Sequence, residues 1–203
     1  RDKFNMGIWD KFFGQFTGKK TKESPYMPVK EDPIDIIFAK KFTSKGGRFL
    51  FCESSDSLFN NYKEICFENK WNPSMILCLN ETLSLSLDIK LFDQSLENLR
   101  SFKAAVIFCE YLISDSGKIL LSEHQIRHFK ISDLPETMVV FAKSNQLVKD
   151  VSQGMTFLKN KYKKQIPTNI STLNIKSNVI KEKFPSVPET NSKNIYLLLE
   201  DDT

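Results

Sequence analysis

Apolar runs and helical stripes alternate along most of the chain. The pattern predicts buried strands and amphipathic helices in turn. The strands fall at 48–52, 75–79, 104–113, 118–122, 137–142 and 195–199, and the helices at 34–43, 58–69 and 147–162. Apolar strands that alternate with helices are typical of a largely parallel sheet covered on both faces. The sequence therefore predicts an α/β fold with a mostly parallel sheet, flanked by helices on both faces, and one antiparallel hairpin.

Three segments shape the details of this prediction. Residues 83–92 alternate strongly enough to predict an edge strand or a broken element. Strand 118–122 is expected to pair with strand 104–113, because Ser114-Asp115-Ser116-Gly117 is a turn sequence. Ser144 is a candidate cap for the helix that follows it, and residues 165–193 are polar and read as irregular.

Residues 1–33 differ from the remainder, 34–203, and predict a separate N-terminal segment. Five apolar residues form a short stripe if this segment is helical, followed by a polar, Pro-containing linker. They are Ile8, Trp9, Phe12, Phe13 and Phe16. Such a helix could dock on its own domain, on a partner subunit or on a membrane surface. A non-catalytic interaction protein that docks through this helix is therefore the alternative function.

Composition excludes several classes of protein. With 203 residues, 40% hydrophobic and 27% charged, the chain is neither disordered nor fibrous. The absence of an apolar run of about 20 residues argues against an integral membrane protein. A net charge of +4 with interspersed signs argues against nucleic-acid binding. The lysines at 159, 161, 163 and 164 read as a solvated face.

No cofactor or metal site is predicted. The four cysteines form no CxxC pair and are expected to be reduced, small hydrophobic residues of a cytoplasmic protein. His124 and His128 lack the glutamate of the zinc-protease motif, and the chain contains no Gly-rich nucleotide loop.

An acidic residue interrupts the apolar run at 104–113. Glu110 would be costly to bury unless it is paired or faces a cleft. It could lie on a solvated strand face, pair with a lysine, or act at a site. Asp115 in the following turn has the same ambiguity, because the turn alone is an ordinary hairpin signal. At a site, Glu110 and Asp115 could act as acid or base or hold a ligand hydroxyl.

A second polar segment precedes the last strand. Its hydroxyls, backbone N–H groups and Lys193 suit a carboxylate or phosphate, although an exposed loop is the alternative. Ligands of parallel sheets bind beyond the carboxyl ends of strands, so we expect this segment and the hairpin to face one hollow. Arg127 could neutralise Asp115 or the ligand there, or have a surface role. The candidate ligand-binding residues are Glu110, Asp115, Ser116, Gly117, Lys118, Arg127, Ser186, Thr190, Ser192, Lys193 and Asn194.

These motifs, in this order, resemble the lactate-utilisation (LUD) domain family of the C-subunit type. The resemblance covers residues 35–200 and rests on an acid–Ser–Gly turn between two strands, then Leu134-Pro135, the strand at 138–142 and Gln146-Leu147-Val148. A Ser/Thr-rich loop before a last apolar strand completes the pattern. Lys118 stands where the family usually has Thr, and Asn194 where it has an acidic residue.

The resemblance implies a fold similar to the sugar-phosphate isomerase and CoA-transferase superfamily. It also implies a component of a lactate-oxidising or related redox system that binds a small anionic metabolite beside iron–sulfur partner subunits. The chain lacks cluster-forming cysteines, so no cofactor of its own is expected. Whether it is an enzyme, and whether it forms a homodimer, stay open at this point.

Overall fold

The computed structural model describes residues 32–93, 98–176 and 191–202. The chain divides between Glu31 and Asp32, and all described residues belong to the second unit. The aromatic stripe at 8–16 lies outside the described residues, and its docking role stays a prediction.

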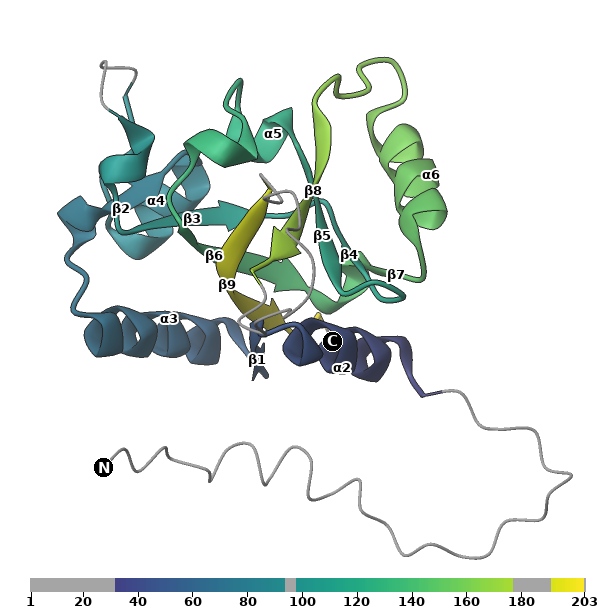
Figure 1. The fold of residues 1–203 in the computed structure, drawn as a ribbon, viewed down its shortest axis with the longest axis horizontal. Helices are drawn as coiled ribbons and strands as arrows, with labels where there is room; N and C mark the ends of the chain where they lie inside the picture. The colour runs from purple at the N-terminus through teal and green to yellow at the C-terminus, as the bar shows by residue number, and fades with distance from the viewer. Residues whose placement is uncertain (1–31, 94–97, 177–190, 203) are drawn as a thin grey trace, which may run out of the picture. The chain divides into compact units, whose positions relative to one another are not determined.

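The second unit is built on a sheet with the strand order β2-β3-β6-β9-β8-β5-β4-β7, in which β1 also pairs with β9. Figure 1 shows the first strands of this order at the left and centre, and the β4–β5 hairpin with β7 on the right. The strands are β1 (Arg48–Cys52), β2 (Ile76–Cys78), β3 (Ala104–Phe108), β4 (Tyr111–Ile113), β5 (Lys118–Ser122), β6 (Thr137–Lys143), β7 (Leu147–Val148), β8 (Ile170–Ile175) and β9 (Ser192–Glu200).

The pairing directions confirm the predicted fold class. Strands β1, β2, β3, β6 and β9 pair in parallel, and β8 runs parallel to β9. β5 pairs antiparallel with both β4 and β8. The predicted hairpin is therefore present and joins the sheet through β8.

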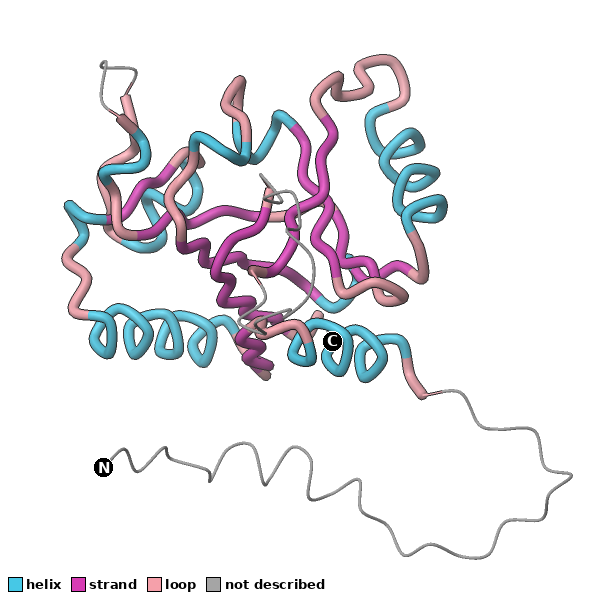
Figure 2. Tube along the Cα trace, viewed as in Figure 1, coloured by secondary structure: helices cyan, strands magenta, loops and turns pink. Residues whose placement is uncertain are grey.

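Helices lie around the sheet, as Figure 2 shows. The α-helices are α2 (Ile34–Ser44), α3 (Ser55–Asn69), α4 (Glu81–Leu87), α5 (Glu123–Ile126) and α6 (Val151–Tyr162). Short 3₁₀ turns occupy Pro73–Met75, Leu99–Ser101, Ile131–Asp133 and Ser144–Gln146.

Three hydrophobic clusters assign these helices to faces. Helices α3 and α4 pack on one face of the parallel strands, beside Val106, Val139 and Leu198. Helix α2 packs on the other face with α5, beside alternate residues such as Ile107 and Val140. Helix α6 forms a smaller cluster with the hairpin. Because successive strand residues point to opposite faces, these parallel strands are buried on both sides.

Side-chain caps set the start of several helices. Ser54 Oγ accepts from the Ser57 N–H at the start of α3, and Asn80 Oδ1 accepts from the Leu83 N–H at the start of α4. Asp150 caps α6 in the same way through the Gln153 N–H. Each cap satisfies a backbone donor that the first helical turn leaves free.

The structure corrects four details of the sequence prediction. Of the two alternatives for residues 83–92, the edge strand is wrong, and the structure shows a broken element, the end of helix α4 followed by a loop. The run at 104–113 breaks at Cys109 and Glu110 into β3 and β4. Helix α6 begins after Asp150, because residues 144–148 form a 3₁₀ turn and the short strand β7. The polar segment 165–193 contains β8.

The turn of the β4–β5 hairpin packs tightly on the end of α2. Gly117 has a φ of 61°, and a Cβ there would lie 2.8 Å from the Phe42 N and 2.9 Å from the Lys41 carbonyl carbon. Both obstacles are backbone atoms, which a rotamer change cannot move. Glycine is therefore required at this position for two separate reasons.

We expect Gly117→Ala to lower the free energy of unfolding by about 2 kcal/mol or more, because it adds both backbone strain and overpacking. Urea denaturation followed by circular dichroism measures this loss. Gly154→Ala in α6 is the matched control. Its Cβ would meet neighbours at 3.4–3.9 Å, so it should change stability by less than about 1 kcal/mol. Equal losses in the two variants would contradict the argument.

Candidate functional site

Glu110 is the centre of a buried polar network between the hairpin, α5 and α6. Its side chain is fully buried. Oε1 accepts hydrogen bonds from Ser122 Oγ at 2.7 Å, Gln125 Nε2 at 2.9 Å and Tyr162 Oη at 2.9 Å. Oε2 accepts from Lys161 Nζ at 2.9 Å. Of the alternatives that the sequence left open, the structure shows the pairing with a lysine.

Local sequence explains why these donors converge. Strand β3 ends at Phe108, and Gln146 Nε2 donates to the Cys109 and Glu110 carbonyls at 2.7 and 3.1 Å. Ser122 and Gln125 form a capping box, the S-x-x-Q signature of a helix start, which orients both side chains around the first turn of α5. These contacts hold the Glu110 backbone and two of its donors in place.

Lys161 and Tyr162 reach the same carboxylate from the last turn of α6. The Lys161 side chain is 49% exposed while the Glu110 side chain is 0% exposed. His124, which is exposed, stacks on the Tyr162 ring with the centroids 4.6 Å apart. The network therefore consists of the buried Glu110 carboxylate, the half-exposed Lys161 ammonium and the stacked rings of Tyr162 and His124.

The electrostatics of the network favour a charged pair. Burial alone would raise the pKa of Glu110, but the bonds from Ser122, Lys161, Gln125 and Tyr162 together hold that pKa below its usual value. Burial would lower the pKa of Lys161, but the hydrogen bond and charge of Glu110 raise it. Burial and the bond to Glu110 both raise the pKa of Tyr162. At neutral pH, Glu110 is therefore an anion, Lys161 a cation and Tyr162 a neutral hydroxyl.

This arrangement limits the chemistry of Glu110. Its oxygens are buried and already accept from all four partners, so it is not poised to attack a ligand or to take up a proton. Lys161 has three N–H donors, one of which is used by Glu110. The group that can meet a ligand is therefore Lys161, held in place by Glu110.

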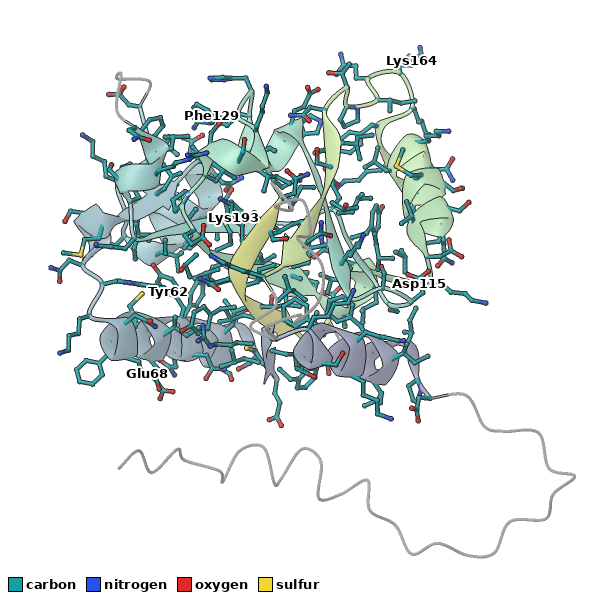
Figure 3. The ribbon with its side chains drawn as sticks, in the orientation of Figure 1. Tyr62, Glu68, Asp115, Phe129, Lys164 and Lys193 are labelled. Atoms are coloured by element: carbon teal, nitrogen blue, oxygen red, sulfur yellow. The ribbon has the colours of Figure 1, made fainter. Side chains whose placement is uncertain are left out.

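The predicted residues of the hairpin turn lie away from this network. Asp115 is exposed, and its N–H donates to the Lys149 carbonyl at 3.0 Å. Lys45 Nζ donates to the Ser116 carbonyl at 2.5 Å. Figure 3 shows Asp115 near the start of α6, whereas Lys164 lies beyond the other end of this helix. Glu110 and Asp115 therefore lie at opposite ends of the hairpin.

Along the strand direction, the start of β9 lies at the opposite end of the parallel sheet from Glu110. Thr137 of β6 pairs with both Ala104 and Asn194, and four residues further along Phe141 pairs with both Phe108 and Leu198. Lys193 and Asn194 therefore lie at the amino ends of the strands. Glu110 comes after Phe108, which is about 13 Å further along the strand direction. The structure does not bring these predicted residues together with Glu110.

The hairpin turn and the start of β9 are closer to each other. Asn174 of β8 pairs with Ser192, and β8 pairs with β5 just beyond Lys118. The side-chain oxygens of Ser114, Ser116 and Asn174 are buried and have no hydrogen-bond partner among the described residues. This second polar corner contains Ser116, Lys118 and Ser192. Ser186 and Thr190 lie outside the described residues.

Lys193 is a buried lysine with a single acceptor. It is 5% exposed, and its Nζ donates to the Leu134 carbonyl at 2.8 Å. No carboxylate in the described ranges forms a salt bridge with it. Burial lowers its pKa, and the charges of Arg100 and Lys176 act in the same direction against those of Glu136 and Asp133.

Of the alternatives left open for Arg127, a salt bridge with Asp115 is not present among the described residues, and the side chain holds two backbone carbonyls. Its guanidinium donates to the Leu79 and Phe92 carbonyls, each at 3.1 Å. Its φ of 54° is unusual for a residue other than glycine. Arg127 therefore clamps the segment around Phe92 to the segment that follows β2.

Sequence analysis missed four of the five residues of the Glu110 network: Ser122, Gln125, Lys161 and Tyr162. The capping box was a readable signal for the first two. Lys161 was one of several lysines assigned to a solvated face, and the buried Glu110 needed a cation from some part of the chain.

The fold and this network define an α/β protein with a parallel core, an antiparallel hairpin and a buried carboxylate that fixes a surface lysine. The sequence model of the LUD domain matches residues 88–186, a segment that contains the whole Glu110 network. No curated protein matches the chain.

A solved structure shares the fold. The crystal structure of a DUF162 family protein from Deinococcus radiodurans is 15% identical, with a TM-score of 0.60, over 86% of this chain and 99% of that chain. At this identity the likeness shows the fold alone. In the part of the chain that the structure describes, no helix combines the length and hydropathy needed to cross a membrane.

We expect Glu110→Gln to lower the free energy of unfolding by about 2 kcal/mol at pH 7, because an amide cannot accept from all the donors that surround the carboxylate. Since folding lowers the pKa of Glu110, its stabilising effect is complete above the usual pKa of glutamate and is lost as the pH falls through the lowered value. The difference between wild type and variant should therefore shrink at acidic pH.

Urea denaturation at pH 7 and at progressively lower pH measures this difference. Glu123→Gln is the matched control, since Glu123 is only partly buried and bonds to Thr168 at the surface. A deficit for Glu110→Gln that is independent of pH would contradict the assigned charge state.

Lys193 gives a prediction of the same sign in an alkaline pH range. Because folding lowers its pKa, the unfolded chain binds more protons between that lowered pKa and the usual value of 10.5. Wild-type stability should therefore rise with pH across this window relative to Lys193→Met, by at most about 1.4 kcal/mol per pH unit. Chemical denaturation at several alkaline pH values measures this change. Lys103→Met, at an exposed lysine, should show no such relative rise.

Proposed function

We propose that this chain is a LUD-related, lactate-utilisation-type protein that binds a small anionic metabolite at Lys161, above the buried Glu110. It serves as a binding component of a lactate-oxidising or related redox system beside iron–sulfur partner subunits. The chemistry of oxidation belongs to those partners. The cation that Glu110 holds at a partly exposed position carries this proposal.

A fixed cation is suited to a carboxylate or phosphate. A free surface lysine loses side-chain entropy when it binds an anion, whereas Lys161 is already oriented by its 2.9 Å bond to Glu110. The raised pKa of Lys161 keeps it charged throughout the neutral range. Two N–H donors of the ammonium are then available for ligand oxygens.

The neighbouring rings restrict the shape of the ligand. Lys161 Nζ lies 5.0 Å from the centroid of the Tyr162 ring, and His124 stacks on the same ring. A short carboxylate that bears a hydroxyl or keto group can meet the ammonium and keep its carbon atoms against this aromatic surface. The match of the LUD domain model to residues 88–186 supports the same ligand class.

Thermal-shift measurements with lactate, sugar phosphates, coenzyme A and folates test this proposal. A ligand at about 100 times its Kd stabilises the folded state by about 2.7 kcal/mol, which gives a clear rise in Tm. We expect at least one of the four classes to give a saturable rise, and lactate is the expected ligand.

Three variants locate the bound anion. Lys161→Met should weaken binding by about 10- to 100-fold, because it removes a charged donor, while Lys161→Arg should retain most of it. Lys159→Met removes an exposed charge from the same helix and should leave affinity unchanged. Asp115→Ala should also have no effect. Loss of binding in Asp115→Ala with retention in Lys161→Met would move the site to the hairpin turn, and no shift with any ligand would overturn the proposal.

A further inference from the structure

A cavity of about 300 Å³ lies against β2, at an edge of the sheet. Its walls include Ile76 and Leu77 of the strand and the rings of Phe92 and Phe102. The two rings meet edge to face with their centroids 6.1 Å apart. This volume is at the lower end of the range of about 300–1,000 Å³ for small-molecule sites, so it suits a compact ligand with an apolar part.

The outer wall of this cavity is held in place from two sides. The Phe92 N–H donates to the Cys78 carbonyl at 2.8 Å, and Arg127 Nη1 donates to the Phe92 carbonyl at 3.1 Å. Phe92 also packs edge to face on Phe129, with the centroids 6.2 Å apart. Both backbone groups of Phe92 are therefore bonded, and the wall is preorganised rather than free to collapse.

Two opposite charges stand at the cavity. Lys90 and Asp93 both line it and are exposed. Among the described residues, neither forms a salt bridge with the other or with a third group. An ammonium and a carboxylate beside an apolar wall complement a ligand that carries both charges and an apolar side chain.

We propose that this cavity, here called the β2 pocket, binds a free amino acid with an aliphatic or aromatic side chain. Lys90 meets the α-carboxylate, Asp93 meets the α-ammonium, and the side chain packs on Phe92 and Phe102. The site is independent of the anion site at Lys161, because the lining of the β2 pocket shares no residue with the Glu110 network. Arg127 holds the wall of the pocket through its bond to the Phe92 carbonyl.

Calorimetric titration with L-leucine and L-phenylalanine tests this inference. We expect saturable binding with a Kd on the order of 0.1–1 mM, as suits a ligand with few atoms. Three probes each remove one part of leucine: 4-methylpentanoate lacks the ammonium, isopentylamine lacks the carboxylate, and glycine lacks the side chain. Each should bind at least tenfold more weakly than leucine.

Two variants test the assignment of the charges. Lys90→Met should weaken leucine about tenfold but leave isopentylamine unchanged, and Asp93→Asn should weaken leucine but leave 4-methylpentanoate unchanged. Both residues are exposed, so neither variant disturbs the core. A merely structural role would not produce this exchange of selectivity. Lys103→Met, outside the pocket, is the matched control and should bind leucine as wild type does.

The outcomes separate this inference from the proposed function. Lys161→Met should bind leucine normally, and Lys90→Met should respond normally to the anion identified at Lys161. Equal affinity for leucine, 4-methylpentanoate and isopentylamine would show a non-specific apolar pocket and overturn the assignment. Absence of leucine and phenylalanine binding to the folded protein would overturn it as well.

Discussion

The burial of one carboxylate organises the half of the molecule that contains the hairpin. Glu110 stands where the parallel strand β3 ends and the chain turns into β4. A buried carboxylate without partners would cost several kcal/mol, so its donors must all be present in the folded state. Those donors come from the end of β5, from α5 and from the last turn of α6. One charge therefore ties together segments that are up to 52 residues apart in sequence.

The direction of the strands explains why a single polar hollow does not form. In a parallel sheet, the segment that enters one strand lies at the amino ends of the strands, whereas the segment that leaves a neighbouring strand lies at their carboxyl ends. Glu110 follows β3, whereas Lys193 and Asn194 begin β9. The hairpin adds a further separation, since its turn lies at one end and Glu110 at the other. Polar residues that are adjacent in a linear list of motifs are thus distributed over two corners of the domain.

The buried parts of the fold could be predicted from the sequence. Strands β3 and β6 follow from continuous apolar runs, because nearly every residue of these two strands is buried. Strand β1 also follows from an apolar run, although only Cys52 of it is fully buried, and helices α2 and α3 follow from apolar stripes. Strand β8 could not be predicted in this way. Only Leu173 and Ile175 of its six residues are buried, and the other four are all partly buried, so no alternation marks the strand.

Helix α4 shows how one pattern fits two structures. Leu83, Leu85 and Leu87 alternate as in a strand, yet Leu83 and Leu87 are also four residues apart and share a helical face. The structure buries Leu83 and leaves Leu85 79% exposed, which a half-buried strand would not do. The cap at Asn80 decides between the two, since its side chain satisfies the first turn of a helix.

The candidate sites were harder to predict because their residues meet only in three dimensions. Glu110 was identifiable as an anomaly, but nothing in the sequence distinguished Lys161 from its neighbouring lysines. Arg127 was identifiable as an isolated arginine, but its partners are backbone carbonyls of Leu79 and Phe92, which carry no signature in sequence. Periodicity reports which face a residue occupies and not which distant segment it touches.

Helix α5 and its C-cap link the two proposed sites through residues that are close in sequence. Gln125 donates to Glu110 beneath Lys161, and Arg127, two residues later, clamps the wall of the β2 pocket. The positive φ of Arg127 costs about 1–3 kcal/mol, and a short helix has little intrinsic stability with which to offset it. The capping box at Ser122 and the buried Ile126 fix this helix in place. The strain at Arg127 therefore persists because both ends of α5 are anchored, and the same anchoring orients the groups on which each site depends.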